Sequence, residues 1–262
     1  MRLLLKILLI IFFSSNNLFS QVRFNPVEIP ILLSGTFGEF RKTHFHSGID
    51  IKTQGKEGLK VRAIEDGDLV RVKISTGGYG KALYIRHYDG TTSVYAHLKK
   101  FSSKIQKIIK ELQYEKKKFE IEKFFKEGKI KLKKSEIIGF SGNTGGSSGP
   151  HLHFEIRDKN ERPMNAQLFG IQAPDHRDPV IKDLVVYPLA DSSQVNQSQL
   201  QQKLNFKKQQ DGTFLAEKIS AYGPLGFAIG TIDQQDGANN NNGIYAIETR
   251  LNGEKTLEVL MD

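Results

Sequence analysis

Two histidines one residue apart, His151 and His153, open a stretch in which polar and apolar residues alternate as far as Arg157. As a β-strand, this stretch would place both imidazoles and Glu155 on one face. The opposite face would carry three apolar residues, Leu152, Phe154 and Ile156. Alternate strand residues lie about 6.6–7 Å apart, so one imidazole could hold a metal ion while the other reaches what the metal binds. The pattern therefore predicts a reaction centre on the polar face.

The glycine-rich run from Ser141 to Gly149 precedes this strand. A phosphate-binding loop would need a Gly-Lys-Ser/Thr ending followed by a helix, and neither is present. Pro150 is tolerated at the first position of a strand. We therefore expect a tight loop that lets backbone or substrate approach closely.

His46 and Asp50 are four residues apart, the spacing that zinc peptidases use on a helix. Gly48 and the β-branched Ile49 and Ile51 argue against a helix here. The sequence instead predicts a turn and then a strand, with the two isoleucines inward and Asp50 on the polar face.

The elements around these residues predict an antiparallel β-domain. Runs typical of strands recur at residues 60–64, 67–74, 81–87, 91–98 and 136–140. Residues 101–118 change to the spacing of an amphipathic helix. Residues 119–133 are expected to form a hairpin.

The composition limits the possible chemistry. The chain has 262 residues and no cysteine, which excludes disulfides, thiol nucleophiles and thiolate metal sites. A metal site must therefore use histidine and carboxylate. The net charge of +9 is confined to residues 99–134, which hold 14 Lys and 5 Glu. This composition is typical of a solvated helix face or of a surface that binds another protein, and no nucleic-acid partner is expected.

The chain divides into three parts. Residues 1–20 read as a secretory signal peptide, whose apolar run is shorter than the roughly 20 residues of a membrane span, so no transmembrane anchor is expected after cleavage. Residues 21–172 are expected to form the β-domain, with a basic helical insertion at about 101–134. Residues 173–262 are expected to form a linker and a partial, Ig-like β-sandwich, truncated at its end.

Three motifs together resemble the lysostaphin-type, LytM-like zinc metallopeptidases, which cut peptide cross-links of bacterial peptidoglycan. The resemblance covers roughly residues 34–170. The motifs are His46-Ser-Gly-Ile-Asp50, Tyr95-Ala-His-Leu98, and Gly142-Asn-Thr-Gly145 leading to Gly149-Pro-His-Leu-His-Phe-Glu155. The resemblance implies one zinc ion per chain, held by His46, Asp50 and His153. It gives the catalytic role to His97 and His151.

The residue types agree with this chemistry. Two neutral imidazoles and one carboxylate leave a fourth zinc position for water, as in catalytic sites. Zinc lowers the pKa of a bound water to about 7, so hydroxide is available at neutral pH. Two further histidines can take up the proton and stabilise the oxyanion.

Other polar residues are weaker candidates. His44, His87 and His176 match no motif and are expected at the surface or in turns. Glu155 shares the face of His153, so it could orient a ligand or be an ordinary surface glutamate. Residues 233–237 predict a turn rather than a calcium loop, because the carboxylate spacing of a calcium loop is missing.

We therefore expect a zinc metalloendopeptidase exported to the periplasm or cell envelope, acting on peptidoglycan stem peptides or cross-bridges. The alternative is a non-catalytic relative that binds peptidoglycan and activates a cell-wall amidase; a zinc peptidase of soluble protein is a third reading. The basic insertion is expected to lie over or beside the groove. The insertion or the C-terminal module could bind a regulatory protein.

Overall fold

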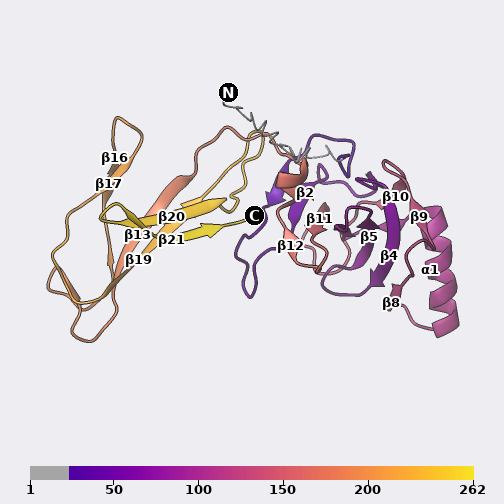
Figure 1. Ribbon diagram of the computed structural model, residues 1–262, viewed down its shortest axis with the longest axis horizontal. Helices are drawn as coiled ribbons and strands as arrows, with labels where there is room; N and C mark the ends of the chain where they lie inside the picture. The colour runs from indigo at the N-terminus through magenta and orange to yellow at the C-terminus, as the bar shows by residue number, and fades with distance from the viewer. Residues whose placement is uncertain (1–23) are drawn as a thin grey trace, which may run out of the picture.

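The computed structural model describes residues 24–262 and shows a mainly β chain with one long helix (Figure 1). The signal peptide expected over residues 1–20 lies outside the described residues. Between residues 24 and 262, no helix has the length and apolar character needed to cross a membrane.

A nine-stranded antiparallel sheet forms the centre of the first part of the chain and confirms the expected β-domain. Seven strands follow one another across it: β1 (Leu33–Gly35), β2 (Ile49–Lys52), β11 (His151–Arg157), β6 (Thr92–Ala96), β5 (Lys81–His87), β4 (Gly67–Ile74) and β8 (Ile121–Phe124). Two short strands extend it, β12 (Pro163–Met164) beside β11 and β9 (Lys131–Leu132) beside β4. The site residues of β2 and β11 therefore belong to adjacent strands.

The main core lies on one face of this sheet. Ile49, Ile51 and Phe154 are fully buried there, as their alternation with polar residues predicts. A three-stranded sheet contributes to the same core: β3 (Lys60–Arg62), β10 (Ile137–Phe140) and β7 (Lys100–Phe101). Because the apolar residues of β2 and β11 point into this core, their polar residues must point to the opposite face.

The predicted helix is present as α1 (Ser103–Lys116), and it buries Ile105 and Ile109 in the main core. It ends at Lys117, which adopts a left-handed conformation with φ 50°. The predicted hairpin over 119–133 is wrong, because β8 and β9 do not pair with each other. Both pair with β4, β8 along residues 71–74 and β9 along residues 67–68. The strands of the insertion thus lie at the edge of the sheet that is far from β2 (Figure 1).

After the short helix η1 (Ala166–Phe169), residues 171–179 form no helix or strand, as expected of a linker. The strands of the C-terminal part are also antiparallel. One sheet has three strands, with β13 (Val180–Pro188) between β15 (Gln202–Lys203) and β19 (Leu225–Ile232). Three further sheets have two strands each: β14 (Gln194–Val195) with β18 (Ala221–Tyr222), β16 (Phe206–Lys208) with β17 (Phe214–Ala216), and β20 (Ala246–Leu251) with β21 (Glu254–Leu260). That these strands form an Ig-like sandwich stays a prediction.

The loop at residues 233–243 connects the C-terminal part to the β-domain. An antiparallel bridge between Asp233 and Asn242 closes the loop. The buried Gln235 accepts a hydrogen bond from the backbone N–H of Leu33 at 3.0 Å, and the N–H of Gly243 donates to Thr36 Oγ1 at 3.0 Å. The loop therefore packs on β1 and on Thr36, the residue that follows it.

Candidate metal centre

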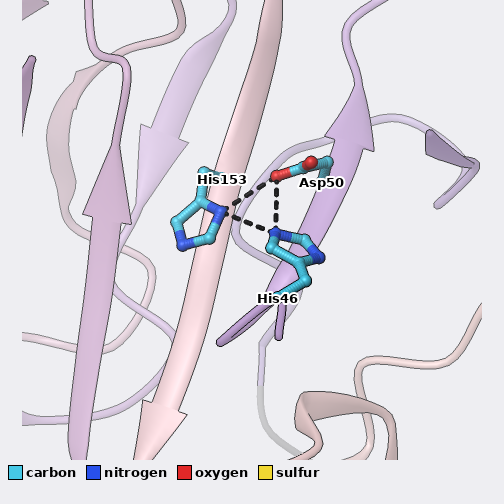
Figure 2. A group of neighbouring side chains, drawn as sticks. All are labelled: His46, Asp50 and His153. Atoms are coloured by element: carbon cyan, nitrogen blue, oxygen red, sulfur yellow. Dashed lines mark hydrogen bonds and ion pairs between the residues drawn. The ribbon is translucent and has the colours of Figure 1, made fainter. Parts of the chain in front are cut away.

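The pairing of β2 with β11 brings the expected metal ligands together. Asp50 lies directly opposite His153 in this antiparallel pair, and His46 precedes β2 by three residues (Figure 2). Asp50 Oδ1 is 2.9 Å from His153 Nδ1 and 3.2 Å from His46 Nε2, and the two nitrogens are 3.0 Å apart. Within residues 24–262, this is the group of potential ligands close enough to share one metal ion.

The outer hydrogen bonds of the two imidazoles determine which nitrogens carry protons. His46 Nδ1 is 2.7 Å from the carbonyl oxygen of Thr36, and His153 Nε2 is 2.8 Å from Glu155 Oε1. Both partners can only accept, so both outer nitrogens must be N–H donors. In the neutral imidazoles the inner nitrogens are then bare lone pairs, and they converge with a carboxylate oxygen. Three acceptors at this separation suit a cation, and two imidazoles with one carboxylate suit zinc.

When no cation is bound, a proton takes its place. Burial lowers the pKa of His153, but the hydrogen bonds and negative charges of Asp50 and Glu155 outweigh this effect and raise it to about 9. Burial raises the pKa of Asp50, yet hydrogen bonds with His151, His153 and His46 bring it below its usual range. Metal binding would therefore release a proton from this group.

Glu155 is fully buried and holds His153 in place, which decides between the two roles that the sequence left open. Its Oε1 also accepts hydrogen bonds from Ser47 Oγ, at 2.7 Å, and from the Tyr79 hydroxyl. Arg157 Nε donates to its Oε2 at 2.6 Å. Burial raises the pKa of Glu155, but His153 and Arg157 outweigh it and lower the pKa to about 2. Glu155 thus remains a carboxylate that accepts a hydrogen bond from His153 Nε2–H.

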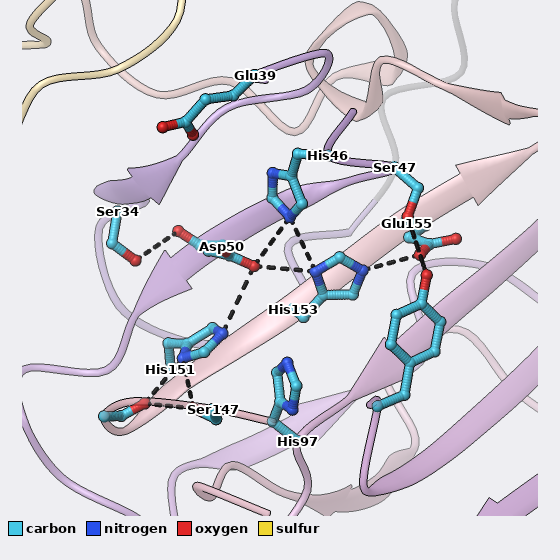
Figure 3. Close-up of polar contacts among 12 residues, drawn as sticks. Ser34, Glu39, His46, Ser47, Asp50, His97, Ser147, His151, His153 and Glu155 are labelled. Carbon is cyan, nitrogen blue, oxygen red and sulfur yellow. Dashed lines mark hydrogen bonds and ion pairs between the residues drawn. The ribbon is translucent and has the colours of Figure 1, made fainter. Parts of the chain in front are cut away.

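His97 and His151 lie beside the predicted ligands, with ring centroids 4.7 Å apart (Figure 3). His97 Nδ1 donates to the carbonyl oxygen of Thr144 at 2.8 Å, and His151 Nδ1 donates to that of Gly149 at 2.8 Å. Burial lowers the pKa of His97 to about 4, so this imidazole is neutral at pH 7. His151 Nε2 is 3.5 Å from Asp50 Oδ1. The neutral imidazole of His97, with Nδ1–H held by Thr144, therefore keeps a proton-free Nε2.

Sequence patterns missed two residues of the site, Tyr79 and Arg41. The Tyr79 ring lies 5.0 Å from the ring of His153, in addition to the hydroxyl contact with Glu155. Arg41 Nη2 donates to Asp50 Oδ2 at 2.6 Å, on the carboxylate oxygen that does not face the histidines. Tyr79 has one visible signal, an aromatic residue between two glycines in a turn. Arg41 has none, because the loop that carries it has no periodicity.

Glycines let the polypeptide chains pass closely at two places around the site. A Cβ at Gly48, between His46 and Asp50, would overlap the carbonyl oxygen of Phe154. A Cβ at Gly145, which has φ 77°, would overlap the backbone of Gly80. The prediction that the glycine-rich run forms a tight loop is confirmed.

A cleft of about 560 Å³ opens beside Asp50 and His151. One wall comes from the loop at residues 146–150, and the other from β2 and the residues that follow it. Its lining residues are Ser34, Glu39, Arg41, Asp50, Lys52, Thr53, Gln54, Gly55, His97, Gly146, Ser147, Ser148, Gly149, Pro150 and His151. None of these belongs to residues 101–134, so the expected position of the insertion at the groove is wrong for this cleft.

The three histidines outside the motifs have different surroundings. His44 and His176 are exposed, as expected. The prediction for His87 is wrong, because this residue is buried at 2% exposure. Its Nδ1 lies 2.9 Å from the carbonyl oxygen of Asp66, and its Nε2 lies 2.8 Å from Ser93 Oγ. His87, in β5, therefore connects the turn before β4 with β6, and none of these residues lines the cleft.

Comparison with known proteins places the same segment in a family. Residues 44–114 and 119–166 match the family described as Peptidase family M23. The DD-carboxypeptidase/endopeptidase Mpg of Neisseria meningitidis is 36% identical over 130 residues, 50% of this chain and 24% of that protein. The glycyl-glycine endopeptidase ALE-1 of Staphylococcus capitis is 32% identical over 111 residues, 42% of this chain and 24% of that protein. The chain thus spans about a quarter of the length of these curated relatives.

Among solved structures, the catalytic domain of the antimicrobial peptidase lysostaphin from Staphylococcus simulans is similar. It is 25% identical with a TM-score of 0.39, and the match covers 54% of this chain and 90% of that domain.

The family match includes every residue of the candidate site named from the motifs. His46, Asp50 and His97 fall in its first segment, and His151 and His153 fall in its second. The resemblance read from the three motifs is confirmed, and the chain contains a peptidase family M23 domain.

Proposed function

We propose that this protein is an exported zinc metalloendopeptidase that hydrolyses peptide cross-links of bacterial peptidoglycan. The observation that carries the proposal is the convergence of three possible metal-binding atoms, of His46, Asp50 and His153, beside the imidazoles of His97 and His151, which line the adjoining cleft with Asp50. The names of the relatives, an endopeptidase of Neisseria and a glycyl-glycine endopeptidase, support peptide cross-links as the substrate.

The proposed domains follow the same division of the chain. Residues 21–172 would form the peptidase domain, and residues 173–262 would form a linker and a C-terminal module. Residues 1–20 would direct export to the periplasm or cell envelope. A regulatory protein that binds the module or the basic insertion stays a prediction.

Zinc held by His46, Asp50 and His153 would polarise the scissile carbonyl and acidify a water molecule. Arg41 occupies Asp50 Oδ2 and so leaves Oδ1 for the metal. The chain's other contribution is proton transfer at the Nε2 atoms of His97 and His151, whose Nδ1–H groups are held by backbone carbonyls. A proton-free Nε2 can accept a proton from the attacking water and later give it to the leaving amine. While protonated, it can donate a hydrogen bond to the oxygen that gains negative charge.

The test is to incubate the mature, zinc-loaded protein with purified sacculi and to identify the released muropeptides by mass spectrometry. We expect cross-linked dimers to disappear and monomers to accumulate, and a chelator to stop the reaction. Protein that is fully loaded with zinc but leaves sacculi and isolated dimers intact would overturn the proposal. In that case the non-catalytic scaffold that activates an amidase would be the better account.

A further inference from the structure

Lys52 continues the polar row of β2 beyond Asp50. In the pairing of β2 with β11, Asp50 lies opposite His153 and Lys52 lies opposite His151. Directly opposed residues of an antiparallel pair have neighbouring side chains on one face, so Lys52 is the neighbour of His151. Lys52 and Asp50 are alternate residues, about 6.6–7 Å apart along the strand. Both line the cleft.

Lys52 differs from the other charged residues of the cleft in having no partner. Arg41 is bound to Asp50 at 2.6 Å and lies 3.8 Å from Glu39. The Lys52 ammonium, in contrast, makes no ion pair or hydrogen bond with any residue in 24–262, although its side chain is partly buried. The opposite wall, residues 146–150, holds only glycine, serine and proline and offers no carboxylate. The two carboxylates of the cleft, Glu39 and Asp50, lie beside Arg41, and within residues 24–262 no carboxylate is within ion-pair distance of the Lys52 ammonium.

We propose that the Lys52 ammonium binds a carboxylate of the substrate, on a residue that flanks the scissile bond. This inference rests on the proposed peptidase function and adds a specificity determinant to it. An extended peptide advances about 3.3–3.6 Å per residue. The distance of about 6.6–7 Å between Asp50 and Lys52 along β2 therefore corresponds to about two residues of an extended substrate. The carboxylate can be a side-chain group of a flanking residue or the C-terminal carboxylate of the cleaved strand. Both sources offer the same charge-assisted contact.

The experiment compares matched cross-linked peptides that differ in one group. One peptide has all carboxylates free, a second has the flanking side-chain carboxylate amidated, and a third has the C-terminal carboxylate amidated. Steady-state kcat and KM are measured for wild type and for Lys52→Met, which keeps the unbranched stem and removes the charge. Lys52→Arg tests retention of the charge. Lys60→Met, at an exposed lysine of β3 outside the cleft, is the matched control.

We expect Lys52→Met to raise KM for the free-carboxylate peptide about tenfold, the equivalent of one charge-assisted hydrogen bond, with kcat unchanged. Wild type should show the same loss on one of the two amidated peptides, and this peptide identifies the source of the carboxylate. On that peptide Lys52→Met should have no further effect. Lys52→Arg should stay close to wild type, and so should the Lys60→Met control.

Equal KM changes on free and amidated peptides, or no change at all, would overturn the role of Lys52. Binding of the same peptides to zinc-loaded protein, measured by calorimetry, keeps this outcome separate from a failure of the proposed function. A wild type that cleaves none of the peptides contradicts the peptidase proposal. The carboxylate subsite is then judged by binding alone: it stands if wild type prefers free carboxylate and Lys52→Met does not, and it falls if both bind all three peptides equally.

Discussion

Each of the four site histidines has a fixed partner on its outer side. Backbone carbonyls of Thr36, Thr144 and Gly149 accept from His46, His97 and His151, and Glu155 accepts from His153. The tautomer and ring orientation of each imidazole are therefore determined by residues outside the predicted ligand set. The roles proposed for the four histidines differ in where the inner nitrogen points.

Removal of a predicted ligand should abolish zinc binding. We expect wild type to carry about one zinc ion per chain. His46→Ala and His153→Ala each leave two of the three predicted ligands, so these variants should lose this zinc. His44→Ala, at an exposed histidine two residues from His46, should keep wild-type zinc content. Metal analysis of the purified proteins measures this directly. Wild-type zinc in either ligand variant would remove that residue from the ligand set.

Removal of a proton-transfer histidine should separate chemistry from metal binding. His97→Ala and His151→Ala should each lower kcat on a cross-linked dimer by about 10²–10⁴-fold, because general acid–base groups contribute this much. Zinc content should stay that of wild type, since neither imidazole is placed among the three ligands. Turnover and metal content are measured on the same samples. If both variants turn over like wild type, proton transfer by these histidines is ruled out.

At the scale of the elements, β2 and β11 could be predicted because a buried face and a polar face leave a clear alternation in the sequence. The neighbours that complete the site could not. Tyr79 and Arg41 enter from loops, and their positions depend on strand pairings between distant residues. The position of His87 was mispredicted because a buried histidine can be satisfied by a carbonyl and a serine that lie far from it in sequence or on another strand.

The insertion was also predicted in part. Its helix shows a clear period, but the partners of β8 and β9 do not follow from their own sequence. The sequence of a short strand with weak alternation does not distinguish between two partners, the next strand in the chain and the open edge of a sheet. The open side of β4 is the partner that the fold provides.

The role of α1 is therefore expected to be structural. Ile105→Ala should lower the free energy of unfolding by about 2–5 kcal/mol, because it leaves a cavity in the main core. Lys107→Ala, at an exposed position on the same helix, should change neither stability nor turnover. Denaturant unfolding and dimer hydrolysis measure the two quantities. A loss of turnover in Lys107→Ala with unchanged stability would return the basic face of the helix to a functional role.

At the scale of the whole molecule, the C-terminal part supports the segment that orients His46. The Leu33 N–H donates to Gln235 Oε1, and the Gly243 N–H donates to Thr36 Oγ1. The carbonyl oxygen of Thr36 accepts a hydrogen bond from His46 Nδ1. The loop at residues 233–243 is thus connected to the metal centre through a single short segment.

Loss of this support should be measurable at the metal. Gln235→Ala leaves the buried N–H of Leu33 without its acceptor, which should cost about 1–3 kcal/mol of stability. Because Leu33 precedes Thr36 by three residues, zinc affinity in chelator competition should fall as well. Asn239→Ala, an exposed position of the same loop, is the control and should match wild type. If the two variants have the same zinc affinity and the same thermal unfolding, the loop does not support the metal centre.

The converging lone pairs of His46, Asp50 and His153 also bear on how long the protein survives in its environment. A ligand that binds only the folded state adds to its stability by an amount that grows with the logarithm of ligand concentration. The three acceptors come together only on folding, so the unfolded chain lacks this site and zinc supply would set the folded fraction. In surroundings depleted of zinc, the protein would spend more time open to proteolysis. Its abundance would then follow the availability of the metal even where its synthesis does not change.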